Sequence, residues 1–495
     1  KKNGYDVKIC EANINNLSSE EVKKEITSYG PDVVGISNMS IEYWSQLHLC
    51  AELAKEADKN IIVIAGGVHP ITLPEKVMED SNVDYVVLSE GEERLFQLLD
   101  IIQSDYDFTR MNGVLYRENG VVKKIPSHGW YRDLNNVTIP DYKSLYDNPE
   151  IVFSNTQISA GGVSTRRTPV ANILSSRGCP YRCTFCSVPV TTGNKMRFRT
   201  PENVLDEIDM LVKEWGVREI VFHDDEMYAS VKRARQIVQL IKDRKYKDLI
   251  WKNSNIASWR LDRDLVKLMA ESGCYQITIS AESGNARVLK DIIHKPGNTL
   301  ESTVDVIKWC KEFGIETHVD FVIGFPDETW DEIRDTTNFA ERLDADSIKF
   351  AVATPFPKTE LLRVAVEKGM FPEDYDWYTN DYLGFANPTM DSEHWTANDL
   401  KMMRVLEWDR INFKTEEKRK RYAKIEEMTL DEVEDFRKET RNNLGVYFVD
   451  DQAESRESSL DNKSDGKTKK WERIQQLNAK IAEDSLKYNH GHEII

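Results

Sequence analysis

Two stretches of the chain alternate short apolar segments with amphipathic ones, and this alternation limits the fold more than any other feature. In the first hundred residues the expected strands are 7–10, 32–37, 61–67 and 84–92. The segments 18–30 and 41–58 between them have the apolar spacing of helices. Buried strands joined by helices form parallel sheets. We therefore expect an α/β fold that begins with a doubly wound, Rossmann-like sheet, whose first elements would precede Lys1.

A second alternating array follows in residues 169–372. Its expected strands are 171–178, 219–226, 249–258, 275–284, 316–325 and 347–356. Six strands with helices between them predict a partial (β/α)6 barrel of the TIM type. In such barrels the chemistry lies at the carboxyl ends of the strands.

The domain boundaries that we predict follow these two arrays. They are a front domain at 1–125, a linker at 126–168, the barrel at 169–372, an aromatic-rich, mostly helical region at 373–445 and a charged, disordered tail at 446–495. Within the fourth region, the segment 375–408 is rich in aromatic residues, namely Tyr375, Trp377, Tyr378, Tyr382, Phe385, Trp395 and Trp408. We expect them either to pack in a core or to line a pocket for a large flat or lipid-like substrate.

Composition excludes several classes of function. A net charge of −18 and a pI of about 5.2 argue against a nucleic-acid-binding surface, which needs clustered Lys and Arg. The sequence has no run of about 18 apolar residues and no secretory leader, so we expect no membrane span. Four of the seven cysteines are scattered through apolar segments, which disfavours a disulfide framework. Together these observations predict a cytoplasmic protein.

The other three cysteines, Cys179, Cys183 and Cys186, lie within eight residues, directly after the first expected strand of the barrel. Thiolates are soft, charged ligands that suit iron, and three of them on a four-iron cubane leave one iron open. Structural zinc normally has four protein ligands, and no second Cys or His pair stands at a fitting distance. A disulfide would leave one thiol unpaired. We therefore predict that these cysteines ligate a 4Fe–4S cluster.

The C-x3-C-x2-C spacing after a strand, with Phe185 before the last cysteine, resembles the signature of the radical S-adenosylmethionine (SAM) superfamily over residues 170–370. The resemblance implies that the open iron binds SAM and that the cluster cleaves it to a 5′-deoxyadenosyl radical. It also implies SAM contacts at Asp224, Asp225, Glu226, Ser280, Glu282 and Gly324. The segment 223–226 departs from the Gly-Gly-Glu usual there, which leaves open which carboxylate contacts SAM.

Two strand ends of the front domain resemble a cobalamin-binding domain. Ser37-Asn38-Met39 is followed, after the 26 residues 40–65, by Gly66-Gly67, and Met39 takes the place of the usual Leu. Glycines let a backbone approach the nucleotide tail of cobalamin closely. The resemblance implies cobalamin contacts at Ser37, Met39, Gly66, Gly67, His69, Glu90 and Gly91. The histidine that ligates cobalt in some relatives would precede Lys1. A flavodoxin-like or nucleotide-binding domain, or one without its ligand, stays open.

Both resemblances together imply a cobalamin-dependent radical SAM enzyme, whose best-known reaction is methylation of an unactivated carbon. The alternatives are an oxidative cyclase of the porphyrin type, a ring rearrangement, and a non-catalytic cobalamin-binding protein. A methylthio-transferring relative would need a cysteine triad in the front domain, where only Cys10 and Cys50 stand. The expected partners are a small-molecule substrate and a reductant such as flavodoxin or ferredoxin, without nucleic acid.

Overall fold

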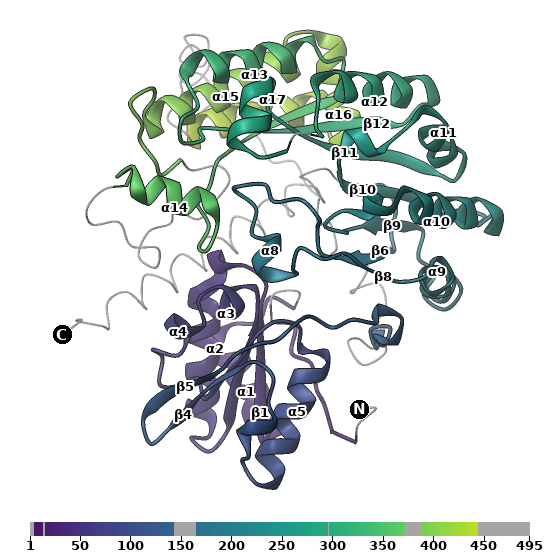
Figure 1. Ribbon diagram of the computed structural model, residues 1–495. Coiled ribbons are helices and arrows are strands. Elements are labelled where there is room, and N and C mark those ends of the chain that lie inside the picture. Colours follow the sequence, from purple (N-terminus) through teal and green to yellow (C-terminus); the bar gives the residue numbers. More distant parts are fainter. Residues whose placement is uncertain (1–3, 13–14, 143–164, 296, 372–387, 444–495) are drawn as a thin grey trace, which may run out of the picture.

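The structure is a computed structural model, and it describes residues 4–12, 15–142, 165–295, 297–371 and 388–443. It consists mainly of two sheets with their helices, the front sheet below and the second sheet above in Figure 1. The predicted tail and the aromatic residues from Tyr375 to Phe385 lie outside the described residues. Within the described ranges, no helix is long and apolar enough to cross a membrane.

The front sheet has five strands in the order β1-β2-β3-β4-β5. They are β1 (Val33–Asn38), β2 (Ile62–Gly67), β3 (Tyr85–Val87), β4 (Val114–Glu118) and β5 (Val121–Ile125). The first three are parallel, and β4 and β5 form an antiparallel hairpin beside β3. The helices are α1 (Ser19–Tyr29), α2 (Trp44–Ala57), α3 (Val68–Thr72), α4 (Pro74–Val77) and α5 (Gly91–Ser104), with short helical turns at Ile41–Tyr43, Phe108–Arg110 and Leu134–Asn136.

Alternating side chains of β2 explain why helices cover both faces of the front sheet. Val63 and Ala65 belong to a core cluster with Leu47 of α2. Ile64 belongs to a second cluster with Leu98 of α5. Successive residues of a strand point to opposite faces, so both faces are buried, and Figure 1 shows α2 and α5 on either side. The order of the described strands does not reverse, so the double winding stays a prediction.

Local signals near the start of the chain gave one correct and one wrong prediction. Helix α1 begins with a capping box at Ser18 and ends at Gly30, which has a φ of +63°. The strand that we predicted at 7–10 is wrong, because this segment has no strand conformation. Val7 and Ile9 are 44% and 43% exposed. A strand needs a neighbour, and the segment pairs with none in the part of the chain that is described.

The second sheet has six parallel strands in the order β13-β12-β11-β10-β9-β6. They are β6 (Val170–Ile173), β9 (Glu219–Phe222), β10 (Ile250–Ile256), β11 (Cys274–Glu282), β12 (Glu316–Ile323) and β13 (Ser347–Val352). A small separate sheet pairs β7 (Ser176–Arg177) with β8 (Arg197–Phe198). The helices are α8 (Val188–Thr191), α9 (Pro201–Trp215), α10 (Val231–Arg244), α11 (Arg263–Glu271), α12 (Leu300–Phe313) and α13 (Trp330–Arg342), with helical turns at Met227–Ser230, Ser258–Arg260 and Val288–Ile292. The predicted alternation is confirmed, and the partial barrel stays a prediction.

One face of the second sheet packs on helices and the other is polar. Phe321 of β12 stacks on Phe350 of β13 at 5.6 Å and meets Phe339 of α13 edge-on at 6.2 Å. Their chain neighbours Asp320 and Lys349 are partners in register and point to the opposite face by alternation. The helix-covered face therefore forms the core, whereas the opposite face carries charged side chains such as those of Asp320 and Lys349.

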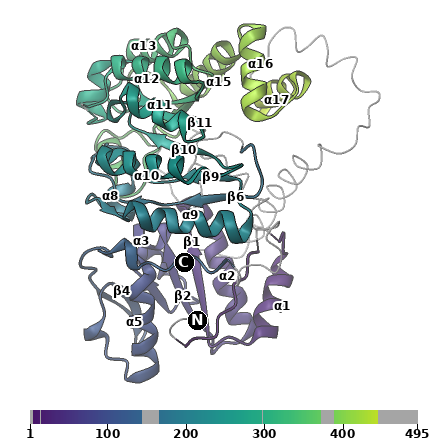
Figure 2. The ribbon, with the colours of Figure 1, turned by 90° about the vertical axis from the view of Figure 1, so that its right-hand side faces the viewer.

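The last helices cover the edge of the second sheet at β13. Along this edge α15 (Ala397–Phe413) places Asn412, whose side chain donates to Ile348 O at 2.8 Å and accepts from Ile348 N at 2.9 Å. Bonds of this kind block the addition of a further strand. The other helices of the region are α14 (Glu360–Glu367), α16 (Glu416–Glu426) and α17 (Leu430–Asn443). Figure 2 shows α16 and α17 beyond α15.

Candidate functional site

The three cysteines of the motif lie on the loop between β7 and α8, beyond the carboxyl end of β6. The first of them is fixed by its backbone, because Cys179 N donates to Gly193 O at 3.2 Å. The ring of Phe185 packs against Phe325, with centroids 5.6 Å apart. Phe325 follows β12, so the loop reaches from the carboxyl end of β6 to that of β12, where the sequence predicts chemistry.

The thiols of Cys179, Cys183 and Cys186 are half-buried, and none is in a disulfide. Burial raises the pKa of both Cys179 and Cys183 to about 12, so these thiols stay protonated until a cation binds them. Within the described parts of the chain, no three His, Cys, Asp or Glu side chains are already gathered as a metal site. Three soft donors on one loop nevertheless fit an iron–sulfur cluster, which would draw the thiols together.

Two of the three acids that follow β9 accept hydrogen bonds from the segment 175–178, which leads into the cysteine loop. Asp224 is buried and accepts three hydrogen bonds, two from Ser175 and one from Ser176. Asp225 accepts from Gly178 N at 2.9 Å, directly before the first cysteine. Both aspartates were predicted as SAM contacts; in the structure their carboxylates accept these hydrogen bonds, and the SAM contacts stay predictions.

Glu226, the third acid, differs from the two aspartates. Its one side-chain hydrogen bond within the described residues comes from Tyr228 N at 3.1 Å. Burial raises the pKa of Glu226 to about 7, and the positive charge of Lys295 limits the rise. Its charge also acts on the Cys179 thiol. Glu226 is therefore the acid of this segment that is best suited to accept a hydrogen bond from an ammonium group.

A buried ion pair lies at the end of β11. Glu282, with a φ of +65°, accepts from Lys295 at 2.7 Å. Lys295 also donates to Ser280 O at 3.2 Å, and Ser280 Oγ donates to Asn255. Burial raises the pKa of Cys183, and the charge of Lys295 offsets part of this rise. We did not predict a role for Lys295. The sequence marks this position only by a Lys-Pro-Gly pattern, which is typical of turns.

Glu328, which we did not predict, fixes the turn after β12 that contains Gly324. Gly324 has a φ of +83°, and a Cβ there would come within 2.4 Å of Leu400. The backbone N–H groups of Gly324 and Phe325 donate to Glu328 at 2.7 and 3.0 Å. Glu328 is fully buried, and burial raises its pKa to about 8. A neutral Glu328 therefore fixes the segment in which we predict a SAM contact.

Ser37, Met39, Gly66 and Gly67 lie at or directly after the carboxyl ends of β1 and β2, and we call this group the glycine edge. The strands pair in register, Ser37 with Gly66 and Asn38 with Gly67. Gly67 has a φ of +94°, and a Cβ there would come within 2.3 Å of Asn38 O. At Gly66 a Cβ would meet no atom within 4 Å, which leaves room for a ligand. Met39 beside them is 82% exposed.

The other predicted cobalamin contacts are His69, Glu90 and Gly91, and the side chains of the first two are buried. His69 is fully buried, and burial together with nearby His48 lowers its pKa to about 4, so it is neutral. Glu90 bonds to two arginines of the second domain. Gly91 begins α5, and the space around its Cβ position is open. The structure thus places Ser37 beside Gly66 on neighbouring strands, and cobalamin contacts of His69 and Glu90 stay predictions.

The glycine edge and the cysteine loop border the same junction between the two domains. Helix α3 starts directly after Gly67, and α8 starts two residues after Cys186. These two helices contact each other, as Figure 1 shows. Lys358, which follows β13, donates to Ile71 O of α3 at 3.3 Å. Elements that follow both predicted cofactor sites therefore meet at this junction.

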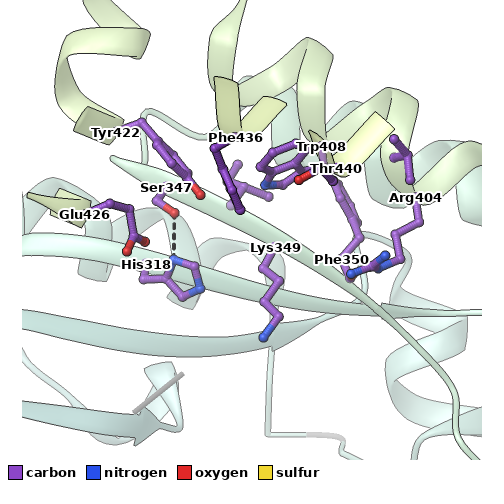
Figure 3. A pocket seen from close by; sticks show the side chains of 12 residues that line it. His318, Ser347, Lys349, Phe350, Arg404, Trp408, Tyr422, Glu426, Phe436 and Thr440 are labelled. Atoms are coloured by element: carbon purple, nitrogen blue, oxygen red, sulfur yellow. Dashed lines mark hydrogen bonds between the residues drawn. The ribbon is translucent and has the colours of Figure 1, made fainter. Parts of the chain in front are cut away.

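A separate cavity of about 190 Å³ lies between β12, β13 and the last helices (Figure 3). At its wall His318 bonds to Ser347 at 2.7 Å. Lys349 and Arg404 also line it, and neither forms an ion pair within the described residues. Trp408, Tyr422 and Phe436 of the predicted fourth region contribute aromatic rings to this wall. Because Ser347 and Ile348 begin β13, the cavity lies near the amino ends of the strands, away from the cysteine loop.

Comparison with known proteins places two family models on the chain, the Radical SAM superfamily over residues 173–340 and the B12 binding domain over residues 1–99. An uncharacterised methyltransferase of Pyrococcus horikoshii is 31% identical over 81% of this chain and 82% of its own. An anaerobic magnesium-protoporphyrin IX monomethyl ester cyclase of Rubrivivax gelatinosus is 26% identical over 81% of this chain and 69% of its own. The solved structure of the radical SAM methyltransferase TsrM of Kitasatospora setae has the same fold, with a TM-score of 0.64 and 19% identity over 76% of this chain and 74% of that one.

Proposed function

The chain belongs to the cobalamin-dependent radical SAM enzymes, and we propose that it methylates an unactivated carbon of a small-molecule substrate. Its cofactors are a 4Fe–4S cluster, SAM and cobalamin. When bound, they supply the electron that cleaves SAM, the radical that activates the substrate and the methyl group. The observation that carries the proposal is the contact of α3 with α8, because it joins the glycine edge to the cysteine loop.

The residues that we assign to the cluster and SAM differ in what they do. Cys179, Cys183 and Cys186 would ligate the cluster, while Asp225 holds the backbone of their loop. Glu226 would accept a hydrogen bond from the SAM ammonium group, because its carboxylate is the least used by the fold. The remaining predicted SAM contacts, Ser280, Glu282 and Gly324, end the neighbouring strands β11 and β12 or follow them directly. Burial of these groups excludes water from a reactive radical.

Cobalamin is assigned to the glycine edge of the front sheet. Gly66 leaves open space, Ser37 can donate a hydrogen bond, and the exposed Met39 offers an apolar contact. The predicted contacts at His69 and Glu90 have less support, because the side chain of His69 is buried and that of Glu90 forms ion pairs. The front domain therefore would hold cobalamin mainly through backbone shape.

An oxidative cyclase is the second candidate, because of the similarity to the magnesium-protoporphyrin cyclase. A ring rearrangement would use the same cofactor sites. The cavity beside β13 is lined by the first residues of that strand and not by the cysteine loop, so its size does not discriminate between these reactions. A non-catalytic cobalamin-binding protein would not need a complete cysteine triad. The reductant, the cytoplasmic location and the absence of a nucleic-acid partner stay predictions.

Methyl transfer and radical cleavage consume SAM in chemically different ways, so one experiment separates these functions without the substrate. The anaerobic protein is loaded with iron, sulfide and cobalamin, reduced, and incubated with SAM. We expect methylcobalamin and S-adenosylhomocysteine from methyl transfer, together with 5′-deoxyadenosine from cleavage. A protein that forms only 5′-deoxyadenosine favours cyclisation or rearrangement. A protein that binds cobalamin but forms none of these products is not an enzyme of this kind.

A further inference from the structure

Glu90 stands at the end of the front sheet, yet its carboxylate bonds outside its own sheet and helices. The residue lies between β3 and α5, and its side chain does not cap the helix. Oε1 accepts from Arg177 at 2.9 Å, and Oε2 accepts from Arg197 and from Tyr131 N. The side chains of Glu90 and Arg197 are each only 8% exposed. A buried ion pair therefore ties the front sheet to the second domain.

The two arginines form a pair that needs this acid. Arg177 of β7 and Arg197 of β8 are direct partners in an antiparallel ladder. Like charges directly opposite one another destabilise such a ladder. Glu90 bonds to each guanidinium group with a different oxygen, and Glu92 adds a second acid on Arg177 at 2.6 Å. The charge that stabilises this small sheet of the second domain thus comes from the front domain.

Both arginines lead directly to the cysteine loop. Arg177 is two residues before Cys179. Arg197 donates to Thr192 O at 2.6 Å, and the next carbonyl, Gly193 O, accepts from Cys179 N at 3.2 Å. The Glu90 carboxylate is therefore linked to the first cysteine along two short routes.

We propose that Glu90 is a positioning residue that fixes the separation between bound cobalamin and the 4Fe–4S cluster. The proposal rests on the cofactor sites proposed above. Removing one partner of a buried ion pair leaves uncompensated charge. Without the Glu90 carboxylate, Arg197 loses the one acid it pairs with among the described residues, Glu92 stays on Arg177 alone, and the junction loosens. The glycine edge and the thiols stay unchanged, so both cofactors still bind, but at a variable separation.

Electron paramagnetic resonance tests this proposal without a substrate. The whole chain is loaded with both cofactors and reduced to cob(II)alamin and the reduced cluster, each of which carries unpaired electron spin. The dipolar splitting between the two spins depends steeply on their separation. We expect Glu90→Gln to keep both signals but to broaden the splitting relative to the unsubstituted protein. The matched control is Glu75→Gln, which removes an exposed pair with Lys124 in the same domain and leaves the splitting unchanged.

A Glu90→Gln splitting as sharp as that of the unsubstituted protein overturns the proposal. Loss of cobalamin from this variant also overturns it, and would return Glu90 to the cobalamin contact predicted from the sequence. Glu90→Asp keeps the charge with a shorter reach, so it should broaden the splitting less, and it serves as the test if Glu90→Gln does not fold. If the unsubstituted protein retains no cluster or no cobalamin, the proposed function fails instead.

Discussion

The strand ends assigned to the two cofactors are built in opposite ways. At the cysteine loop, side chains carry the proposed site, since three thiols are the donors and Asp225 holds their backbone. At the front sheet, backbone shape carries it, since Gly66 leaves open space and Gly67 lies against β1. Replacing a cysteine removes a whole metal ligand, whereas a small side chain added at a glycine fills only part of the space that a ligand would occupy. Substitutions should therefore abolish cluster binding but weaken cobalamin binding by degrees.

The largest effect is expected when Cys179, Cys183 and Cys186 are all replaced by Ala. Bound iron and sulfide should fall to background, because the described residues contain no other group of three metal ligands. Iron and sulfide analysis with absorption spectra measures this. Cys10→Ala, at an exposed thiol of the front domain, should keep the full cluster. A cluster retained by the triple variant would contradict the assignment of these ligands.

The two glycines of the front sheet should separate ligand binding from stability. In Gly66→Ala the new Cβ meets no protein atom, so we expect an unchanged melting temperature with cobalamin binding weakened about tenfold, roughly 1.4 kcal/mol. In Gly67→Ala both the melting temperature and the affinity for cobalamin should fall, because a positive φ at a residue with a side chain costs about 1–3 kcal/mol. Cobalamin retained on gel filtration and thermal melts measure the two quantities. Wild-type cobalamin affinity in Gly66→Ala would place the ligand elsewhere.

Substitutions of the acids after β9 should likewise separate an effect on SAM binding, at Glu226, from an effect on stability, at Asp224. Glu226→Gln is expected to weaken SAM binding several-fold, since charge-assisted hydrogen bonds contribute about 1.5–3 kcal/mol, and to leave the cluster intact. Because its pKa is about 7, its carboxylate forms as the pH rises, so SAM affinity should increase from pH 6 to about 8. The variant should lose this increase. Asp224→Asn is the control, because it disturbs three buried hydrogen bonds and should lower stability more than SAM affinity.

These contrasts also show how much the sequence could reveal. Apolar runs predicted the alternation of strands and helices, because burial on a sheet depends on local pattern. The segment 7–10 has the same pattern but no described neighbour, so the prediction there was wrong. Ser37 and Gly66 could be paired from their spacing, and the structure confirms that they are neighbours. The long-range partners of Glu90 and Glu282 were not predictable, because no local pattern encodes a contact between distant segments.

The smallest predicted effect tests whether cobalamin binding follows the glycine edge or the general stability of the front domain. Ser18→Ala removes the cap of α1, far along the chain from Gly66, and should cost about 1 kcal/mol of stability. Because the glycine edge is unchanged, cobalamin retention should equal that of the unsubstituted protein. Urea unfolding and gel filtration on the same sample measure both quantities. If retention falls in step with stability, then the loss in Gly66→Ala would no longer indicate a local contact, and the contrast between the two edges would disappear.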